Sequence, residues 1–294
     1  MATHPGPTAL FDILSYWAHW VWLRRARAKA ARMAFSEETI TETLLLDLAT
    51  ALPGQLHIEA FTKPKEGKTG ADWEWCFYDL AAGHFFRMLI QAKSLDARDQ
   101  AYTKLYYKVG KPKPGKHQPF QIARLRATAA RRGVPAMYVF YNHLTDARRL
   151  PPSPCHCCAG CADCWGCSIA HADAIWALRW DNSFDTLRHI SMPWACIACL
   201  TPSRSDPPSG PEAVRQGLQL FEAQVVAGAR EFGMPPPPRH EYVLETTPPS
   251  YFDEVRKGSP DSSDTERSAR LARRNPGVDG VVLVDLGRDP DRHI

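Results

Sequence analysis

The sequence predicts an α/β protein with a mixed central sheet flanked by helices. Two observations predict this class. The chain of 294 residues, 44% hydrophobic and 23% charged, is long enough and apolar enough to bury a core. Over residues 36–150 the apolar pattern gives a helix, three strands, a helix and a strand. The three strands have the short connections of a meander, and the fourth follows a helix, so it can pair in parallel with a neighbour.

The first segment, residues 1–35, is predicted to hold an amphipathic helix over 8–33 that packs on the core. Leu10, Leu14 and Trp17 recur at helical spacing. Arginines crowd its C-terminal half, so a transit peptide or a membrane-surface helix stays open. No apolar run is long enough to span a membrane and no signal-peptide cleavage site is evident. We therefore expect no membrane span and a cytoplasmic protein.

The core is expected to begin at Ser36, a good N-cap for a helix that carries Ile40 and Leu44 on its apolar face. Gly and Pro punctuate the segments that follow. Strands are expected at Leu56–Phe61, Ala71–Tyr78 and Phe85–Leu95, then a helix at Phe120–Arg132 and a strand at Pro135–Tyr141.

The composition changes after residue 150. Residues 151–200 read as a Cys-rich insertion. Residues 201–294 read as a Pro-rich, partly disordered C-terminal extension, because 11 of the 25 prolines lie in 201–260. Within this extension we expect a helix at Pro211–Phe232, disorder or a mobile helix at Ser259–Arg274, and a late strand at Gly280–Leu286.

Four polar residues occur on two of the predicted strands. Residues two apart on a strand share a face, so Asp72 and Glu74 point the same way, and so do Gln91 and Lys93. Charged groups in a sheet built for burial are costly unless they are paired or bind a metal. Glu38, in the first turn of the preceding helix, can reach the same place. Carboxylate and amide oxygens suit a hard cation such as Mg²⁺ or Mn²⁺, and Asp72, Glu74, the Gln91 side-chain carbonyl and Glu38 can supply them.

These residues lie in two motifs, Gly70-Ala71-Asp72-Trp73-Glu74-Trp75 and Leu89-Ile90-Gln91-Ala92-Lys93. Together the motifs resemble the active-site pattern of the PD-(D/E)xK nuclease superfamily, in its Mrr-like restriction-endonuclease branch. The resemblance implies a restriction-endonuclease-like core in which Asp72 binds Mg²⁺ and Gln91 and Lys93 form the second motif. It also implies a helical acid, Glu38 or Glu42, and a role for Gln121. Residues 10–142 resemble an uncharacterised bacterial family built on this core.

One departure from the commoner superfamily pattern affects the expected metal site. Gln91 stands where that pattern has a second acid, so the site has less negative charge to hold Mg²⁺. We therefore expect Glu74 or Glu38 to compensate.

Residues 97–132 form a basic block of ten Lys or Arg residues with one acid, in a chain whose net charge is only +4. Such a block predicts a polyanionic partner, here DNA, although a solvated helical face with a basic loop would look the same. The residues expected to contact DNA are Lys104, Lys108, Lys111, Lys113, Lys116, Gln121 and Arg124.

Eight of the nine cysteines lie in the insertion, and seven of these recur in C-x-x-C spacing, which is typical of a metal site. Two C-x-x-C pairs separated by a longer loop can share one ion, so we expect structural Zn²⁺ on Cys164, Cys167, Cys196 and Cys199. Three more cysteines, Cys155, Cys158 and Cys161, are then spare or hold a second ion with His156. An iron–sulfur cluster is the rival interpretation.

The sequence therefore predicts a metal-dependent endonuclease that hydrolyses phosphodiester bonds in DNA, and the resemblance implies a role in restriction or defence against foreign DNA. The alternative is a non-catalytic nucleic-acid-binding protein with a degraded nuclease core and a zinc module. A third interpretation is a structural protein docked through residues 8–33. A homodimer is left open.

Overall fold

The computed structural model describes residues 9–61, 70–96, 98, 100–110, 117–178, 180–199, 210–231, 240–257, 264–275 and 278–287. The helices are α1 (Ala9–Ala30), α2 (Glu37–Ala51), α3 (Gln121–Arg132), α4 (Ala172–Ala177), α5 (Phe184–Leu187), α6 (Gly210–Glu231), α7 (Phe252–Lys257) and α8 (Asp264–Arg274). The strands are β1 (Leu56–Ala60), β2 (Trp73–Asp79), β3 (His84–Ser94), β4 (Ala136–Tyr141), β5 (Cys167–His171), β6 (Met192–Pro193) and β7 (Gly280–Asp285). Short 3₁₀ helices include η2 (His156–Cys158), η3 (Asp163–Gly166) and η5 (Trp194–Ala198).

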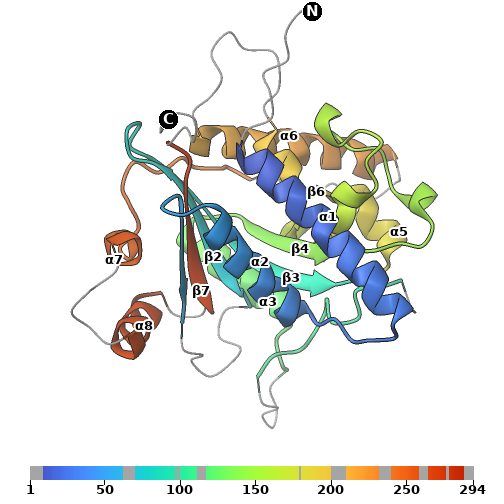
Figure 1. Cartoon of the computed structure of the whole chain (residues 1–294), viewed down its shortest axis with the longest axis horizontal. Helices are drawn as coiled ribbons and strands as arrows, with labels where there is room; N and C mark the ends of the chain where they lie inside the picture. The colour runs from blue at the N-terminus through green and yellow to red at the C-terminus, as the bar shows by residue number, and fades with distance from the viewer. Residues whose placement is uncertain are drawn as a thin grey trace, which may run out of the picture.

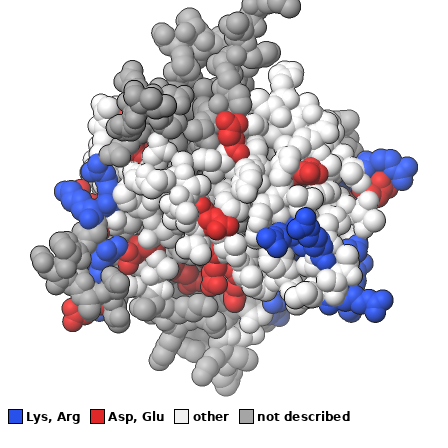
Figure 2. All heavy atoms as spheres, in the orientation of Figure 1, with Lys and Arg blue, Asp and Glu red and all other residues white. Residues whose placement is uncertain are grey.

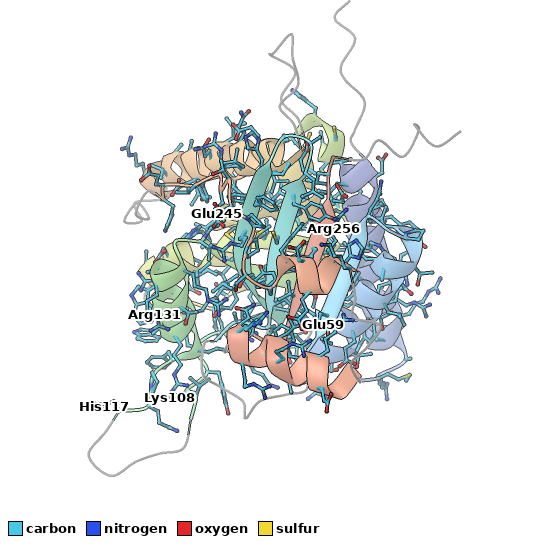
Figure 3. All side chains as sticks on the ribbon, turned by 90° about the vertical axis from the view of Figure 1, so that its left-hand side faces the viewer. Glu59, Lys108, His117, Arg131, Glu245 and Arg256 are labelled. Atoms are coloured by element: carbon cyan, nitrogen blue, oxygen red, sulfur yellow. The ribbon has the colours of Figure 1, made fainter. Side chains whose placement is uncertain are left out.

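The strands form one mixed sheet in the order β1-β7-β2-β3-β4-β5-β6. Strand β2 is antiparallel to β3, and β3 is parallel to β4. Helices α1 and α2 lie on one face of this sheet and α3 lies on the other (Figures 1 and 3). The predicted chain order of helix, three strands, helix and strand is therefore confirmed, as is the α/β class with a mixed sheet between helices.

The predicted meander is wrong at its first step. Strand β7 lies between β1 and β2, antiparallel to the former and parallel to the latter. All of its residues are buried, and its run Val281–Val284 is apolar throughout, as expected of a strand covered on both faces. Gly280 is needed at its start, because a side chain there would collide with the Trp73 ring and the Glu59 carbonyl oxygen.

The boundary expected at residue 200 is wrong for the same reason, because a strand from the supposed extension completes the centre of the sheet. The segment Ser259–Arg274, expected to be disordered or a mobile helix, contains the helix α8 (Asp264–Arg274). Its Ser268 hydroxyl donates to the Ala60 carbonyl oxygen at 3.1 Å, and its Leu271 is buried. The described part of residues 201–294 therefore belongs to the core.

Helix α1 packs against the Cys-rich segment. Its Leu14, Trp17 and Val21 are buried, and the Trp194 indole of η5 donates to the Leu14 carbonyl oxygen at 2.6 Å. A side chain at Gly166 would collide with the backbone of Ala18, so η3 can approach α1 closely only with glycine there. Among the described residues, no helix combines the length and apolar character needed to cross a membrane.

Candidate active site and metal centre

Asp72 lies just before β2, where that strand meets β3. Its backbone N–H donates to the Ile90 carbonyl oxygen at 2.9 Å, and its own carbonyl accepts from Asp279 at 2.6 Å, so neighbours on both sides fix it. Its Oδ2 accepts hydrogen bonds from Gln91 Nε2 at 2.6 Å and from the Ala92 N–H at 3.0 Å. Among the described residues, nothing donates a hydrogen bond to Asp72 Oδ1, which leaves that oxygen available to a ligand.

Gln91 connects Asp72 to helix α3. Its side chain is almost fully buried, and its Oε1 accepts from Gln121 Nε2 at 2.7 Å. Gln121 itself is anchored, because its backbone N–H donates to the Tyr107 carbonyl oxygen at 2.8 Å. The expected metal ligand, the Gln91 carbonyl oxygen, thus faces Gln121, and the amide nitrogen faces Asp72. A half-turn of the amide group would exchange the two atoms.

Lys93 lies on β3 two residues beyond Gln91 and is buried, with its Nζ 3.4 Å from Glu37 Oε1. Glu37 is fixed at this point, because its Oε2 accepts from the Ser94 N–H at 3.2 Å. The acid that α2 contributes is therefore Glu37. The predicted Glu38 and Glu42 are exposed, although the charge of Glu38 still acts on Asp72.

The pKa values of both carboxyl groups in this cluster, Asp72 and Glu37, are raised above their usual values. Burial raises the pKa of Asp72, against the opposing effects of Lys93 and of the hydrogen bonds from Ala92 and Gln91. Burial also raises the pKa of Glu37, and the nearby charge of Asp72 adds to the rise while Lys93 opposes it. Two acids beside one ammonium group leave an excess of negative charge that a cation would offset.

Glu74 does not join this cluster, contrary to expectation. It is fully buried, and both of its oxygens are engaged: Oε1 accepts from Arg87 at 3.0 Å and from the Tyr251 hydroxyl at 2.7 Å, and Oε2 accepts from Arg132. Arg87 also pairs with Glu245 at 2.7 Å. Glu74 therefore closes a buried ion-pair network that joins β2, β3 and α3, which is how a carboxylate without a metal is stabilised at such a place.

The basic block is only partly free to meet DNA. Lys104 and Lys108 are exposed, Lys108 over the Phe120 ring, and Arg124 is half-buried. The side chains of Arg126 and Arg132 are instead paired with Asp173 and Glu74. Lys111, Lys113 and Lys116 lie outside the described residues.

The exposed basic residues and the acidic ones lie on different parts of the surface. Lys108 and His117 lie below the end of α3, in the view of Figure 3. Figure 2 shows acidic side chains over α2 in the middle of the face that it shares with α1, and basic ones to the right of them and toward the rim.

The predicted zinc ligands are only partly correct. Cys155, Cys158 and Cys196 offer ligand atoms within 4.8 Å of one another. The Cys199 thiol interacts with Cys155 and lies 3.4 Å from the thiol of Cys157. Cys167 is the first residue of β5 and is fully buried in the core, where burial raises the pKa of its thiol well above the usual value. The C-x-x-C pair that meets Cys196 and Cys199 is therefore Cys155 and Cys158, and this cluster can bind a metal such as zinc.

A second thiol pair includes a residue from α1. Cys161 Sγ and Cys164 Sγ are 2.7 Å apart, and His19 Nε2 lies 3.4 Å from the former and 3.8 Å from the latter. The histidine near these thiols is thus His19, and the predicted His156 is exposed. Sequence spacing gave no signal for His19, because 142 positions separate it from Cys161.

A third group of ionisable residues carries an internal salt bridge. The Nε2–H of His240 donates a hydrogen bond to Asp173 Oδ2 at 2.6 Å, and its Nδ1–H donates to Glu222 Oε1 at 2.8 Å. Burial disfavours its charged form, but these bonds outweigh burial and raise the pKa of His240 to about 9. Because both nitrogens then carry protons at neutral pH, His240 is a cation here. His171, Asp173 and His240 also offer ligand atoms within 4.8 Å of one another.

The described residues thus define an α/β protein with a mixed seven-stranded sheet flanked by helices, a polar cluster beside its central strands, and Cys/His clusters able to bind a metal such as zinc. The chain belongs to a family of unknown function, DUF6615, which matches residues 10–286 and so includes both clusters. No curated protein and no solved structure matches the chain.

Proposed function

We propose that the protein is a metal-dependent endonuclease that hydrolyses phosphodiester bonds in DNA. The observation that carries this proposal is the meeting of Asp72, Gln91 and Lys93 with Glu37 where β2, β3 and the start of α2 converge. Burying a lysine and two carboxylates beside a sheet costs free energy, and packing alone does not require these charged groups. It has a use where phosphate and a cation must be held together.

The residues present fit a divalent cation of the Mg²⁺ class. Asp72 offers Oδ1, Glu38 adds negative charge nearby, and Gln91 can turn its amide oxygen toward the site. Glu74 is not needed in this scheme, since its oxygens serve Arg87, Arg132 and Tyr251. A bound cation would stabilise charge on the reacting phosphate and lower the pKa of an attacking water.

The chain's own residues would divide the remaining work. Glu37 positions Lys93, whose Nζ lies 3.4 Å from Glu37 Oε1, so that the ammonium group can also contact a non-bridging phosphate oxygen. Gln121 fixes Gln91, and Gln91 together with the Ala92 N–H fixes the Asp72 carboxylate. The proposed core is of the restriction-endonuclease-like type, and the exposed Lys104 and Lys108 would contact the DNA backbone.

The experiment that tests this proposal is a nuclease assay on supercoiled plasmid, single-stranded DNA and RNA, with Mg²⁺, Mn²⁺ or EDTA. We expect nicking or linearisation of plasmid with either cation and none in EDTA. Equal cleavage with EDTA present, or cleavage of RNA alone, would contradict the proposal.

One observation favours a second function, a nucleic-acid-binding protein without catalysis. The Gln91 oxygen is turned away from Asp72, and Glu74 is committed to arginines, so Asp72 is the one motif acid left to hold a cation. Under this alternative the protein binds DNA with an affinity that falls with salt, and cleaves none of the three substrates in either metal.

A further inference from the structure

Seven side chains of the metal-ligating types meet where α1, η2, η3 and η5 converge. The first group holds two C-x-x-C pairs, and the second holds one C-x-x-C pair and a histidine from α1. Their members are Cys155, Cys158, Cys196 and Cys199 in the first group and Cys161, Cys164 and His19 in the second.

The two groups are in contact through one residue. The thiol of Cys158 lies within 4.8 Å of the thiols of Cys155 and Cys196 on one side, and it interacts with the thiol of Cys164 on the other. Cys158 is 1% exposed, so it is the most enclosed thiol of the seven-residue set. A thiolate has more than one lone pair and can bind two cations at once. Cys158 is therefore placed to serve both groups.

We propose that this cluster binds two zinc ions that share the thiolate of Cys158. Two four-coordinate ions need eight ligand positions, and seven side chains fill eight positions when one of them bridges. The first ion would take Cys155, Cys158, Cys196 and Cys199. The second would take Cys158, Cys161, Cys164 and His19.

The surroundings of the ligands also suit metal binding. Asp163 Oδ2 lies 3.7 Å from His19 Nδ1, so the carboxylate can hold the ring with Nε2 turned to the thiols, an arrangement common behind zinc-bound histidines. The Ser153 hydroxyl lies 3.6 Å from Cys196 Sγ and 3.8 Å from Cys155 Sγ, so it can donate to either thiolate.

The thiols are placed for metal rather than for disulfides. All nine cysteines are free, and the closest pairs are Cys161–Cys164 at 2.7 Å and Cys155–Cys196 at 2.9 Å, longer than the ~2.05 Å of a disulfide bond. A tetrahedral ion about 2.3 Å from each sulfur holds the sulfurs about 3.8 Å apart, so each pair opens by roughly 1 Å when the ion enters.

Two ions at this place would join α1 to the Cys-rich segment. His19 would bind α1 covalently, through metal, to η3, beside the close approach of Gly166 to Ala18. The first ion would likewise join η2 to η5, whose Trp194 indole donates a hydrogen bond to the Leu14 carbonyl oxygen. The proposed role is structural, and it is independent of the nuclease proposal because none of the seven ligands belongs to the Asp72 cluster.

The test is the metal content and the metal spectrum of the intact chain. We expect two zinc ions per chain after purification under reducing conditions. After exchange with ¹¹³Cd, two resonances should appear, each split by the other through the shared sulfur. One zinc per chain, two unsplit resonances, or iron with acid-labile sulfide in place of zinc would overturn the proposal.

Variants distinguish the two ions without loss of the fold. His19 is 44% exposed at its side chain, so His19→Ala should fold and carry one zinc in place of two, with a single unsplit ¹¹³Cd resonance. His117→Ala is the matched control, because His117 is an exposed histidine outside the seven ligands. It should retain both ions, and retention of both by His19→Ala would also contradict the assignment.

Discussion

Glu37, the first residue of α2, lies 3.4 Å from the ammonium group of Lys93 on β3, and its second oxygen accepts from the Ser94 N–H. This contact links the start of α2 to the end of β3, which are more than fifty residues apart in the sequence. It gives the proposed site a carboxylate that the motif alone did not identify.

Glu37→Gln is therefore expected to lower plasmid cleavage by about 100-fold, because it removes the charge that holds Lys93 beside the phosphate. The rate of single-turnover cleavage at saturating Mg²⁺ is the measurement. Glu42→Gln, one turn further along the same helix and exposed, provides the comparison. A larger loss in Glu42→Gln than in Glu37→Gln would return the helical acid to the position that the sequence pattern suggested.

Gln91→Glu should make the fold depend on a divalent cation. The new carboxylate would face Asp72, where Gln91 now donates at 2.6 Å, so without metal two like charges meet. We expect Mg²⁺ to raise the melting temperature of Gln91→Glu by several degrees more than that of the wild type. The same shift in both proteins would show that no cation binds between these residues.

Glu74→Gln should destabilise the protein without entering the chemistry. It removes a fully buried charge and leaves Arg87 and Arg132 short of a partner, at a cost of about 3–5 kcal/mol in the free energy of unfolding. Urea unfolding measures this cost, with Asp253→Asn as the control, since the Asp253 side chain is 74% exposed. An unchanged stability would mean that the network contributes little; a folded variant unable to cleave would place Glu74 in the active site after all.

The salt bridge of His240 predicts a loss of stability in alkaline solution. Its pKa is raised from about 6.5 to about 9, so its contribution is complete below pH 6.5 and is lost as the pH rises through 9. The groups that face it are Asp173 and Glu222, its partners, and the stacked ring of His171, whose pKa burial lowers to about 3. Arg126 stands behind Asp173.

His240→Gln should remove this dependence, at a cost of order 1 kcal/mol near neutral pH, allowing for the partial exposure of the ring. The measurement is the free energy of unfolding between pH 6 and pH 10 in both proteins. Parallel curves would exclude His240 as the group responsible.

The local spacing of apolar residues predicted most of the helices and strands, but it did not predict which strands lie side by side in the sheet. The spacing of apolar residues located β1 to β4 and their helices, and it also found the strand at β7. It could not show that β7 enters between β1 and β2, because its pairing partners lie some two hundred residues away and leave no local signal. The apolar run Val281–Val284 does indicate a strand covered on both faces, which only a central position provides.

The residues of the candidate site also fall into those that the sequence predicted and those that it missed. Asp72, Gln91 and Lys93 were found because strand spacing fixes which residues share a face. Glu37 was missed by one position, since successive helical residues point in different directions and the entry angle of α2 is set by packing. The roles of Glu74 and His19 depend on partners from distant segments, Arg132 of α3 and the thiols of η3, and no spacing rule reaches them.

The most direct test of the nuclease account compares Asp72→Asn and Lys93→Ala with wild type and with Asp253→Asn in one plasmid-cleavage assay with Mg²⁺, after circular dichroism has shown that all four are folded. The account predicts that wild type and Asp253→Asn cleave at similar rates. It predicts that Asp72→Asn and Lys93→Ala bind DNA and leave the plasmid intact. Cleavage by Asp72→Asn and Lys93→Ala at the wild-type rate would contradict it.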